Sequence, residues 1–515
     1  MVNLTGPVLS KYNAESLVAQ DLNNIANSLA LKDSSLWGEA AKLEAAVRLN
    51  WLDLPKSSRD LLPELDALSA WARAKNLTNF ILCGMGGSSL APEVMAKTYK
   101  KNLTILDTTD PGQIKAGIPT TLVNTLVIVG SKSGSTIETA SQKAFFEKLF
   151  QDANLDPKEH FVIVTDPDSP LDKSSRLAGF KVINADPKVG GRFSALSAFG
   201  LVPAALIGID VSVLLDDADH ASQSFAQANS PAIKLATLIF EQCEQNFSLT
   251  DEGSNVSGLG DWIEQLIAES TGKDQRGRLP IVIESASAQV SGPALKIGFA
   301  DGVADLNVIA NLGEHFILWE WVTALLCRAL KVDPFNQPNV TEAKERTGEL
   351  LLQWAQSGVP KSTATFSTEN LEIFFNGNAK NFADALNSLI TPTSKYLAVM
   401  AYLNRFEDSA ISEIRNLLAT KTKIGTTFGW GPRFLHSTGQ FHKGGAQNGV
   451  FIQVTGESSH DLDIPNNGFT FQTLLMAQAL GDAAAIESRN FPLMRIHLKN
   501  REAGIVELLE LVRAL

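Results

Sequence analysis

The stretch NFILCGMGGSS at residues 79–89 joins an apolar run to a glycine- and serine-rich loop, and LVIVGSKSGST at residues 126–136 repeats the pattern. Both apolar runs predict buried strands, and both loops precede a helical pattern. Glycines let the backbone approach an anion, and the free N–H groups at a helix start attract negative charge. Further donors are the hydroxyl groups of Ser88, Ser131, Ser133 and Thr136. The two loops therefore predict one pocket built around a phosphate group.

Around these loops, residues 77–250 alternate between strand, loop and helix patterns. The predicted strands are 79–83, 103–106, 126–130, 161–165 and 180–184. Strands that alternate with helices indicate a parallel sheet with helices on both faces. Because such sheets bind ligands at the carboxyl ends of their strands, both loops lie where a ligand is expected.

The rest of the chain predicts three further domains. Residues 1–76 have helical spacing and predict a cap. Residues 251–369 predict a second α/β domain, with helices at 261–271, 314–330 and 341–356 and strands at 280–284 and 305–310. The stretch 356–370 is typical of a linker. Residues 370–515 predict a C-terminal α/β unit, with strands at 396–402, 449–455 and 493–498 and a helix at 501–514.

Composition excludes several classes of protein. The chain has 515 residues, 44% of them hydrophobic and 19% charged, which is typical of a globular protein. Its net charge of −12 argues against a nucleic-acid partner. We find no signal peptide and no apolar run long enough to span a membrane. The 3 scattered cysteines indicate a reducing cytoplasm rather than a disulfide framework, and no ligand spacing suggests a metal site.

The first loop alone is ambiguous. GMGGSS resembles a dinucleotide fingerprint, and Asp107 follows at the distance of a ribose-binding acid. Ser89, however, stands where that fingerprint has its third glycine. The second hydroxyl-rich loop favours a monophosphate over a dinucleotide. An NAD-dependent oxidoreductase therefore remains an alternative.

A cation stands near the same sheet edge. In VGGRFS at residues 189–194, two glycines precede Arg192, shortly after the strand predicted at 180–184. Glycines allow a close backbone approach at that point. We therefore expect Arg192 in the pocket rather than in a surface turn.

Several motifs together resemble the phosphoglucose isomerase family. They are GMGGSS, SKSGST, VGGRFSALSAFGL, ESTGKDQRGRLP (269–280), LGEHFILWEW (312–321), DPFNQPNVTEAK (333–344) and HSTGQ (436–440). The chain is most similar to the isomerase half of the bifunctional transaldolase–phosphoglucose isomerase proteins. Since it has no room for a transaldolase barrel, we expect a stand-alone isomerase.

The resemblance implies an α/β fold with two sugar-isomerase (SIS) domains, at 77–250 and 251–369, followed by the C-terminal unit. It implies interconversion of glucose 6-phosphate and fructose 6-phosphate, in glycolysis and gluconeogenesis, without a metal or cofactor. The catalytic roles fall to Glu269 as the base, Arg192 on the enediolate, and His436 and Lys344 in ring opening. The phosphate would be held by Gly87, Ser88, Ser131, Lys132, Ser133 and Thr136.

The residue types suit this chemistry. Moving a carbonyl between neighbouring carbons needs one group that removes a proton and returns it next door, as a carboxylate can. Glu269 lies in the last turn of a predicted helix, where the helix dipole disfavours its ionised form and Lys273 opposes that effect. A fixed cation such as Arg192 stabilises a developing enediolate. His436 lies in a glycine-rich segment and has His442 as its nearest rival.

The sequence leaves the roles of several residues and the oligomeric state undecided. Lys344 falls in the first turn of a helix, and a solvated lysine is the ordinary interpretation there. Glu314 is expected to be the N-terminal acid of an apolar helix that also carries His315. In ordinary family members the histidine motif precedes the lysine and comes from the neighbouring subunit. Here it follows, so we expect His436 to act within its own chain, in a monomer or a homodimer.

Two other functions are compatible with these motifs. A non-catalytic SIS-domain sensor of sugar phosphates would not need Glu269. An isomerase could also act on another hexose phosphate, such as mannose 6-phosphate, because the sequence does not reveal which hydroxyl groups the pocket recognises.

Overall fold

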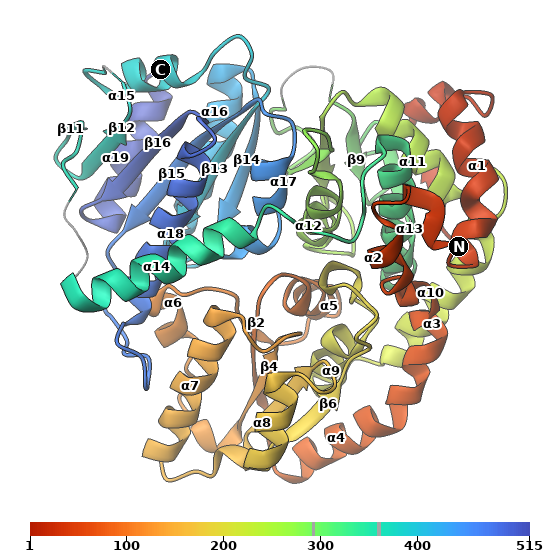
Figure 1. Cartoon of the computed structure of the whole chain (residues 1–515), viewed down its shortest axis with the longest axis horizontal. Helices are drawn as coiled ribbons and strands as arrows, with labels where there is room; N and C mark the ends of the chain where they lie inside the picture. Colours follow the sequence, from red (N-terminus) through yellow and green to blue (C-terminus); the bar gives the residue numbers. More distant parts are fainter. Residues whose placement is uncertain (291–293, 358–361, 378) are drawn as a thin grey trace. The chain divides into compact units, whose positions relative to one another are not determined.

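The computed structural model describes residues 1–290, 294–357, 362–377 and 379–515, which form two compact units (Figure 1). The first unit comprises Met1–Asp107, Gly117–Ala286 and Leu295–Gln337. The second comprises Thr108–Ala116, Ser287–Ala294 and Pro338–Leu515. The four-part division expected from the sequence stays a prediction.

The first unit contains a parallel sheet with the strand order β3-β2-β4-β5-β6. Its strands are β2 (Asn79–Gly84), β3 (Thr104–Leu106), β4 (Thr125–Gly130), β5 (Phe161–Thr165) and β6 (Lys181–Asn184). The strands predicted between residues 79 and 184 are therefore confirmed. Their near-continuous apolar sequences fit a sheet that is buried on both faces.

Alternate side chains of β4 enter different cores, as strand geometry requires. Val127 and Val129 pack with Phe146 of α7 (Ile137–Asp152), whereas Ile128 belongs to the core on the other face. That second core includes α5 (Leu90–Thr98) and α9 (Ala198–Leu206), and Figure 1 shows α7 and α9 on opposite sides of the sheet. The predicted helix-covered sheet is thus confirmed.

A second sheet of the first unit has the order β1-β10-β9-β7-β8, parallel except for β1 at its edge. Its strands are β1 (Asn3–Thr5), β7 (Asn246–Thr250), β8 (Leu279–Val282), β9 (Lys296–Gly298) and β10 (Leu306–Ile309). Only β8 and β10 were predicted. β1, β7 and β9 were missed because they are short and rich in polar residues or glycine.

Helices bury these sheets. In the first unit they also include α1 (Leu17–Ala30), α2 (Lys42–Ala46), α3 (Leu54–Ser57), α4 (Leu62–Ala74), α8 (Pro170–Ala178), α10 (Val211–Phe225) and α11 (Pro231–Gln242). The helical character predicted for the first 75 residues is confirmed apart from β1. No helix in the part of the chain that the structure describes is long and apolar enough to cross a membrane.

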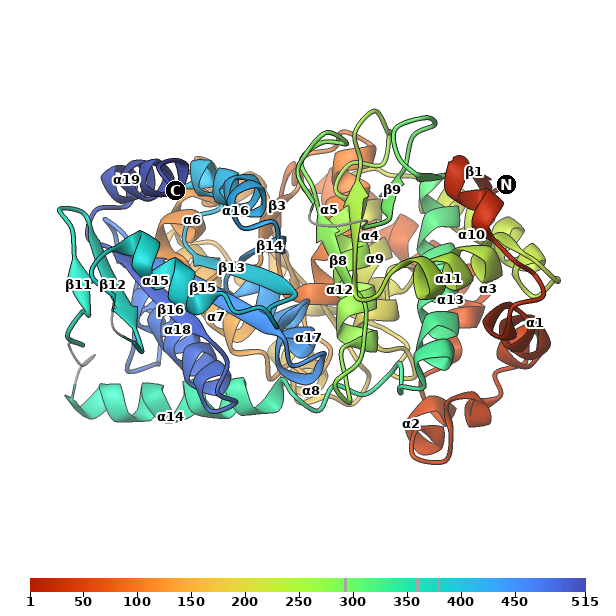
Figure 2. The ribbon, with the colours of Figure 1, turned by 90° about the horizontal axis from the view of Figure 1, so that it is seen from above.

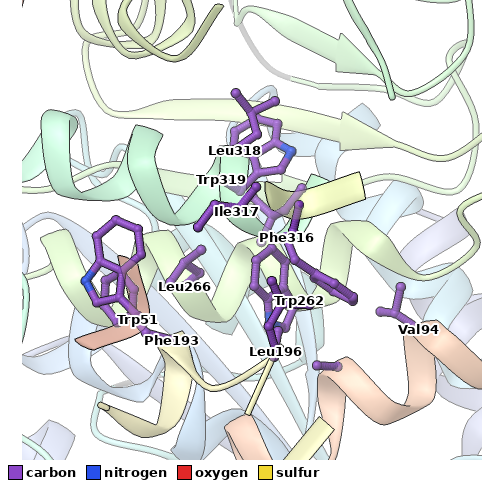
Figure 3. Packing of buried hydrophobic residues seen from close by; sticks show 14 of the residues in the cluster. Trp51, Val94, Phe193, Leu196, Trp262, Leu266, Phe316, Ile317, Leu318 and Trp319 are labelled. Atoms are coloured by element: carbon purple, nitrogen blue, oxygen red, sulfur yellow. The ribbon is translucent and has the colours of Figure 1, made fainter. Parts of the chain in front are cut away.

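An aromatic core fixes α12 (Leu259–Thr271) against α13 (Leu312–Leu330), both of which were predicted. The rings of Trp262 and Phe316 meet edge to face, with centroids 4.9 Å apart, as Figure 3 shows. In the same cluster Phe193 packs on Trp51 at 5.3 Å. Each such pair contributes about 0.5–1.5 kcal/mol beyond the burial of its surface. The core therefore anchors the residue after Arg192 and the helix that carries Glu269.

The second unit is built on a sheet with the order β11-β12-β16-β15-β13-β14, whose last four strands run parallel. The strands are β11 (Phe366–Ser367), β12 (Leu371–Phe375), β13 (Tyr396–Tyr402), β14 (Gly425–Trp430), β15 (Gly449–Gly456) and β16 (Leu493–Leu498). The predicted strands β13, β15 and β16 are confirmed, and β11, β12 and β14 were missed. Residues 358–361 of the predicted linker lie outside the described residues.

Helices lie on both faces of this sheet as well. They are α6 (Pro111–Ala116), α14 (Thr341–Ser357), α15 (Phe382–Leu389), α16 (Ile414–Thr422), α17 (Gly439–Gly444), α18 (Phe471–Glu487) and α19 (Arg501–Arg513). Figure 2 shows α16 and α19 on one side and α14 and α18 on the other. Both units therefore belong to the α/β class, as the sequence predicted.

Candidate active site

The first glycine loop crosses the end of the neighbouring strand. Gly84 and Gly130 are paired residues at the carboxyl ends of β2 and β4. Ser88 ends the 3-10 helix η5 (Gly86–Ser88). A Cβ atom at Gly84 would lie 3.1 Å from Ser88 Cβ, and one at Gly130 would lie 3.2 Å from the same atom. Glycines at both strand ends therefore let Ser88 lie over the point where the second loop begins.

The second loop forms a hydroxyl-lined turn before α7. The backbone N–H of Ser131 donates to Val164 O at 3.0 Å, and Ser131 Oγ accepts the N–H of Gly134 at 3.1 Å. Thr136 is the N-cap of α7 and makes no side-chain capping hydrogen bond, and its Oγ1 lies 3.5 Å from Ser131 Oγ. The turn thus presents hydroxyl groups beside the first amides of α7, an arrangement suited to an anion.

Two predicted phosphate ligands in this loop already have protein partners. Lys132 Nζ lies 2.5 Å from Asp166 Oδ2 and also donates to Pro187 O at 3.3 Å. Burial lowers the pKa of Lys132, and burial raises the pKa of Asp166. Ser133 is exposed, and its hydroxyl lies 2.7 Å from that of Ser135. Lys132 would have to leave Asp166 to bind a phosphate directly.

The first loop also touches the backbone that precedes Arg192. A Cβ atom at Gly87 would lie 1.9 Å from Gly191 O and 3.1 Å from Arg192 N, so a side chain at Gly87 cannot be accommodated. Gly191 and Arg192 belong to the 3-10 helix η8 (Gly191–Phe193), and η5 packs against both η8 and α12. The loop, the arginine and the helix that carries Glu269 therefore meet in the first unit.

Arg192 is held from three sides. The residue is 5% exposed. Nε donates to Ser270 Oγ at 2.7 Å, and Nη2 donates to Pro334 O at 2.6 Å. Nη1 lies 3.2 Å from Glu269 Oε1 and donates to Gln337 Oε1 at 3.2 Å. The guanidinium group is therefore fixed beside the carboxylate, and its place in a substrate pocket stays a prediction.

Glu269 lies in the last turn of α12, as predicted, and is 8% exposed. Its Oε2 accepts a hydrogen bond from Gln265 Nε2 at 3.1 Å, one turn earlier in the same helix. Arg192 holds the other oxygen. Each oxygen is therefore directed by one partner, which fixes the carboxylate at the end of a rigid helix.

Two features beside this pair were not predicted. Lys273 is 2% exposed, and its Nζ donates to Asp333 O. Burial lowers the pKa of Lys273 to about 7, and the charge of Arg192 acts in the same direction. The loop Asp333–Gln337 therefore holds both cations through its carbonyl groups. The motif DPFNQPN marked this loop in the sequence, but nothing there indicated its contact with Arg192.

In the second unit, His436 ends the 3-10 helix η10 (Arg433–His436) and is half-buried. Lys344 lies near the start of α14 and is exposed. The segments that carry them are joined by a pair of amides: Asn339 N donates to Gln440 Oε1 at 3.0 Å, and Gln440 Nε2 donates to Asn339 Oδ1 at 2.9 Å. The histidine loop and the start of the lysine helix are thus fastened together.

His442, the rival of His436, has a different environment. It is buried, and its ring stacks on Tyr396 with centroids 5.8 Å apart. Burial lowers the pKa of His442 to about 3. A buried, uncharged histidine inside an aromatic cluster is a poor proton carrier near neutral pH. Accessibility therefore favours His436 for acid–base chemistry.

Asp107, which suggested a dinucleotide site, is buried and accepts a hydrogen bond from Ser89 Oγ at 3.3 Å. A ribose-binding acid would instead face the ligand. Glu314 forms a capping box with Asn311 at the start of α13, as expected of an N-terminal acid. Within the described residues, no group of three or more His, Cys, Asp or Glu side chains could hold a metal ion.

Comparison with known proteins identifies similar sequences. Residues 59–274 match the family model "Phosphoglucose isomerase". A probable glucose-6-phosphate isomerase of Haloarcula marismortui is 30% identical over 247 residues, covering 46% of this chain and 57% of that protein. A glucose-6-phosphate isomerase of Thermus thermophilus is 32% identical over 258 residues, covering 46% of this chain and 59% of that protein. The chain thus spans less than two thirds of the length of these relatives.

The fold is also found among solved structures. A glucose-6-phosphate isomerase from Chlamydia trachomatis superposes with a TM-score of 0.57. The match covers 69% of this chain and 89% of that protein, at 17% sequence identity. The matched family segment contains both glycine loops, Arg192 and Glu269, whereas Lys344 and His436 lie beyond it.

Proposed function

We propose that this chain is a glucose-6-phosphate isomerase, which interconverts glucose 6-phosphate and fructose 6-phosphate. The observation that carries the proposal is the buried ion pair between Arg192 and Glu269, 3.2 Å apart, beside the glycine loop at 84–89. A carboxylate that moves a proton, a cation that stabilises an anion and a loop suited to phosphate are the parts this reaction needs. Similarity to phosphoglucose isomerases over residues 59–274 supports the same reaction.

In the proposed reaction, Glu269 removes the proton from C2 of the open-chain aldose. The electrons of the C–H bond form the C1–C2 double bond of a cis-enediolate, and the negative charge moves to oxygen. Arg192, fixed beside the carboxylate, stabilises that charge. Glu269 then returns the proton to C1 while the proton of the O2 hydroxyl passes to O1, which yields the ketose with its carbonyl at C2 and a hydroxyl at C1. One carboxylate therefore suffices for both transfers of the carbon-bound proton.

The phosphate group would bind between the two loops. Gly87 and Ser88 would supply donors from the first loop, and Ser131, Ser133 and Thr136 from the second. Lys132 would exchange its carboxylate partner Asp166, 2.5 Å away, for the phosphate. In a protein with a net charge of −12, such local donors must outweigh the long-range repulsion of the ligand.

Ring opening would fall to His436 and Lys344. Their joint attachment through Asn339 and Gln440 supports a shared role. We propose that His436 acts on substrate bound by its own chain, so that a monomer is active. Gel filtration with activity assays at falling protein concentration tests this: activity lost on dissociation contradicts it.

The finer likeness, to the isomerase half of bifunctional transaldolase–phosphoglucose isomerase proteins, is part of the proposal. It is supported by the position of the histidine motif after the lysine. The buried free thiols Cys83, Cys243 and Cys327 are compatible with a reducing compartment such as the cytoplasm.

Two other functions are tested by the same experiment. A sugar-phosphate sensor would bind but not convert its ligand, and an isomerase of another hexose phosphate would prefer a different sugar. An NAD-dependent oxidoreductase is disfavoured because Asp107 is buried and accepts a hydrogen bond from Ser89 of the first glycine loop.

The experiment measures turnover of several hexose 6-phosphates, with binding followed by calorimetry, in wild type and Glu269→Gln. We expect turnover of glucose 6-phosphate by wild type. Glu269→Gln should bind the sugar phosphate but not convert it. The matched control Glu64→Gln, at an exposed position of α4, should keep wild-type turnover. Undiminished turnover in Glu269→Gln would eliminate the proposal.

A further inference from the structure

Lys273 is a buried cation at the carboxyl end of α12 that the proposed mechanism does not use. It follows the cap residue Gly272 and stands four positions after Glu269. The residue is 2% exposed. Lysine is seldom buried so completely unless its charge has a purpose or a partner, because desolvation of an ammonium group is costly.

The partner of Lys273 is a backbone carbonyl rather than an opposing carboxylate. Its Nζ donates to Asp333 O, and Arg192 Nη2 donates to Pro334 O at 2.6 Å and to Asn336 O at 3.2 Å. The Asp333 carboxylate itself accepts the N–H of Phe335 at 2.8 Å. One short loop therefore accepts hydrogen bonds from two buried basic side chains.

The groups that face Lys273 come from every element around it. Arg192 of η8 is the like charge, and burial together with this charge lowers the pKa of Lys273 to about 7. Glu269 of α12 and Asp333 act in the opposite direction, and the buried thiol Cys327 of α13 is the remaining titratable neighbour. Glu269, the buried carboxylate of the site, thus interacts electrostatically with both Arg192 and Lys273.

We propose that Lys273 is a positioning residue for the isomerisation, whose charge, together with Arg192, prepares the end of α12 to receive the negatively charged intermediate. The proposal rests on the proposed function and adds a residue to it. Lys273 fixes the loop Asp333–Gln337, and through that loop it fixes the guanidinium group of Arg192. Its own charge adds to the field that stabilises the enediolate.

This arrangement predicts that Lys273 takes up a proton when a negatively charged ligand binds. In the free protein at pH 8 most Lys273 is neutral, because its pKa is about 7. A new negative charge nearby favours the protonated form. Binding of an enediolate mimic at pH 8 should therefore draw a proton from solution, whereas binding at pH 6 should not involve Lys273.

The probe is a five-carbon aldonic acid 5-phosphate, whose carboxylate resembles the two enediolate oxygens. Calorimetry of wild type in buffers of different ionisation enthalpy gives the number of protons taken up. We expect clear proton uptake at pH 8 and less at pH 6, because burial lowers the pKa of Lys273 and a bound negative charge raises it again. No uptake at pH 8 overturns the proposal, and this measurement needs no variant.

Two variants assign the proton to Lys273. Lys273→Met should lose the uptake and lower kcat at least about tenfold with little change in KM. Lys273→Arg keeps the charge, so the basic limb of the kcat/KM profile, expected near pH 7, should move upward by more than one unit. Unchanged proton uptake and kcat in Lys273→Met, or an unmoved limb in Lys273→Arg, overturns the proposal.

A matched control is Lys331→Met, an exposed lysine at the end of α13 just before the same loop. It should keep wild-type proton uptake, kcat and pH profile. Failure of the proposed function is recognised separately: wild type would then neither convert the sugar phosphate nor bind the probe at any pH. A purely structural role of Lys273 would lower stability in Lys273→Met but leave the wild-type proton count at zero.

Discussion

Arg192 Nη1 lies 3.2 Å from Glu269 Oε1, and both side chains are buried. The arginine comes from the glycine-rich turn after β6, and the glutamate from the end of α12, so the fold alone creates the pair. A buried ion pair is costly to break, because removal of one partner leaves an uncompensated charge. This pair therefore links the stability of the first unit to its proposed chemistry.

Substitutions in the Arg192–Glu269 pair should have different effects on stability and on catalysis. Arg192→Met should lower kcat by about 10²–10³, the cost of one donor to a developing oxyanion. It should also lower the free energy of unfolding by about 3–5 kcal/mol. In Arg192→Met/Glu269→Gln, part of that stability should return while activity does not. Urea unfolding and steady-state kinetics measure both, and additive stability losses in the double variant would contradict the coupling.

Gly87 should be the most sensitive glycine of the first loop. A Cβ atom there meets Gly191 O at 1.9 Å, a clash that only a backbone shift can relieve. Gly87→Ala should therefore displace the loop, lower the melting temperature and weaken sugar-phosphate binding. Gly191→Ala is the matched control for stability, because nothing lies within 4 Å of its added Cβ. Equal melting temperatures for the two variants would show that the close approach is not maintained in solution.

His315 should make the first unit sensitive to acid. Burial lowers its pKa to about 3, and neither ring nitrogen has a hydrogen-bond partner among the described residues. In the unfolded chain its pKa is about 6.5, so below that pH the unfolded state binds the extra proton and stability falls as the pH decreases. From pH 6.5 to 5 the loss from this residue is about 2 kcal/mol.

His315→Leu should remove that loss. Urea unfolding of both proteins at pH 7 and pH 5 gives the comparison. We expect wild type to lose about 2 kcal/mol more than the variant over this interval. The same loss in both proteins would mean that other groups control the acid limb of stability.

The amide pair of Asn339 and Gln440 should position His436 and Lys344 together. The Gln440 side chain takes part in both hydrogen bonds: it accepts the Asn339 backbone N–H at 3.0 Å and donates to Asn339 Oδ1 at 2.9 Å. Gln440→Ala therefore removes both hydrogen bonds, whereas Asn339→Ala removes only the second. Asn339→Ala and Gln440→Ala should each lower turnover, and the double variant should be no worse than the more impaired single variant. Ring-opened substrate should be less affected than cyclic substrate. Multiplicative losses in the double variant would argue against a shared role.

The parallel sheet around the glycine loops was predictable because buried parallel strands have continuous apolar sequences. β7 was not, since NFSLT at residues 246–250 mixes polar and apolar residues although most of its side chains are buried. β9 has only the three residues KIG, too few for a periodic signal. The edges and short strands of the other two sheets were therefore missed. The helices α12, α13 and α14 were predicted from the helical spacing of their apolar residues.

Within the site, the residue types were predictable but their contacts were not. Motif resemblance selected Glu269 and Arg192, yet no sequence spacing indicates that the carbonyl groups of Pro334 and Asn336 hold the guanidinium group. Lys273 follows a glycine, which is typical of an exposed turn, and only the packing of the loop Asp333–Gln337 buries it. His436 and His442 were distinguishable only by burial.

The most direct test is the fate of the transferred proton. Wild type and Glu269→Gln are incubated with glucose 6-phosphate in deuterium oxide, and deuterium at C1 of the fructose 6-phosphate formed is measured by NMR. We expect wild type to form fructose 6-phosphate labelled at C1, because a carboxylate exchanges its proton with solvent, and Glu269→Gln to form no product. Labelled product formed by Glu269→Gln at the wild-type rate would contradict this expectation.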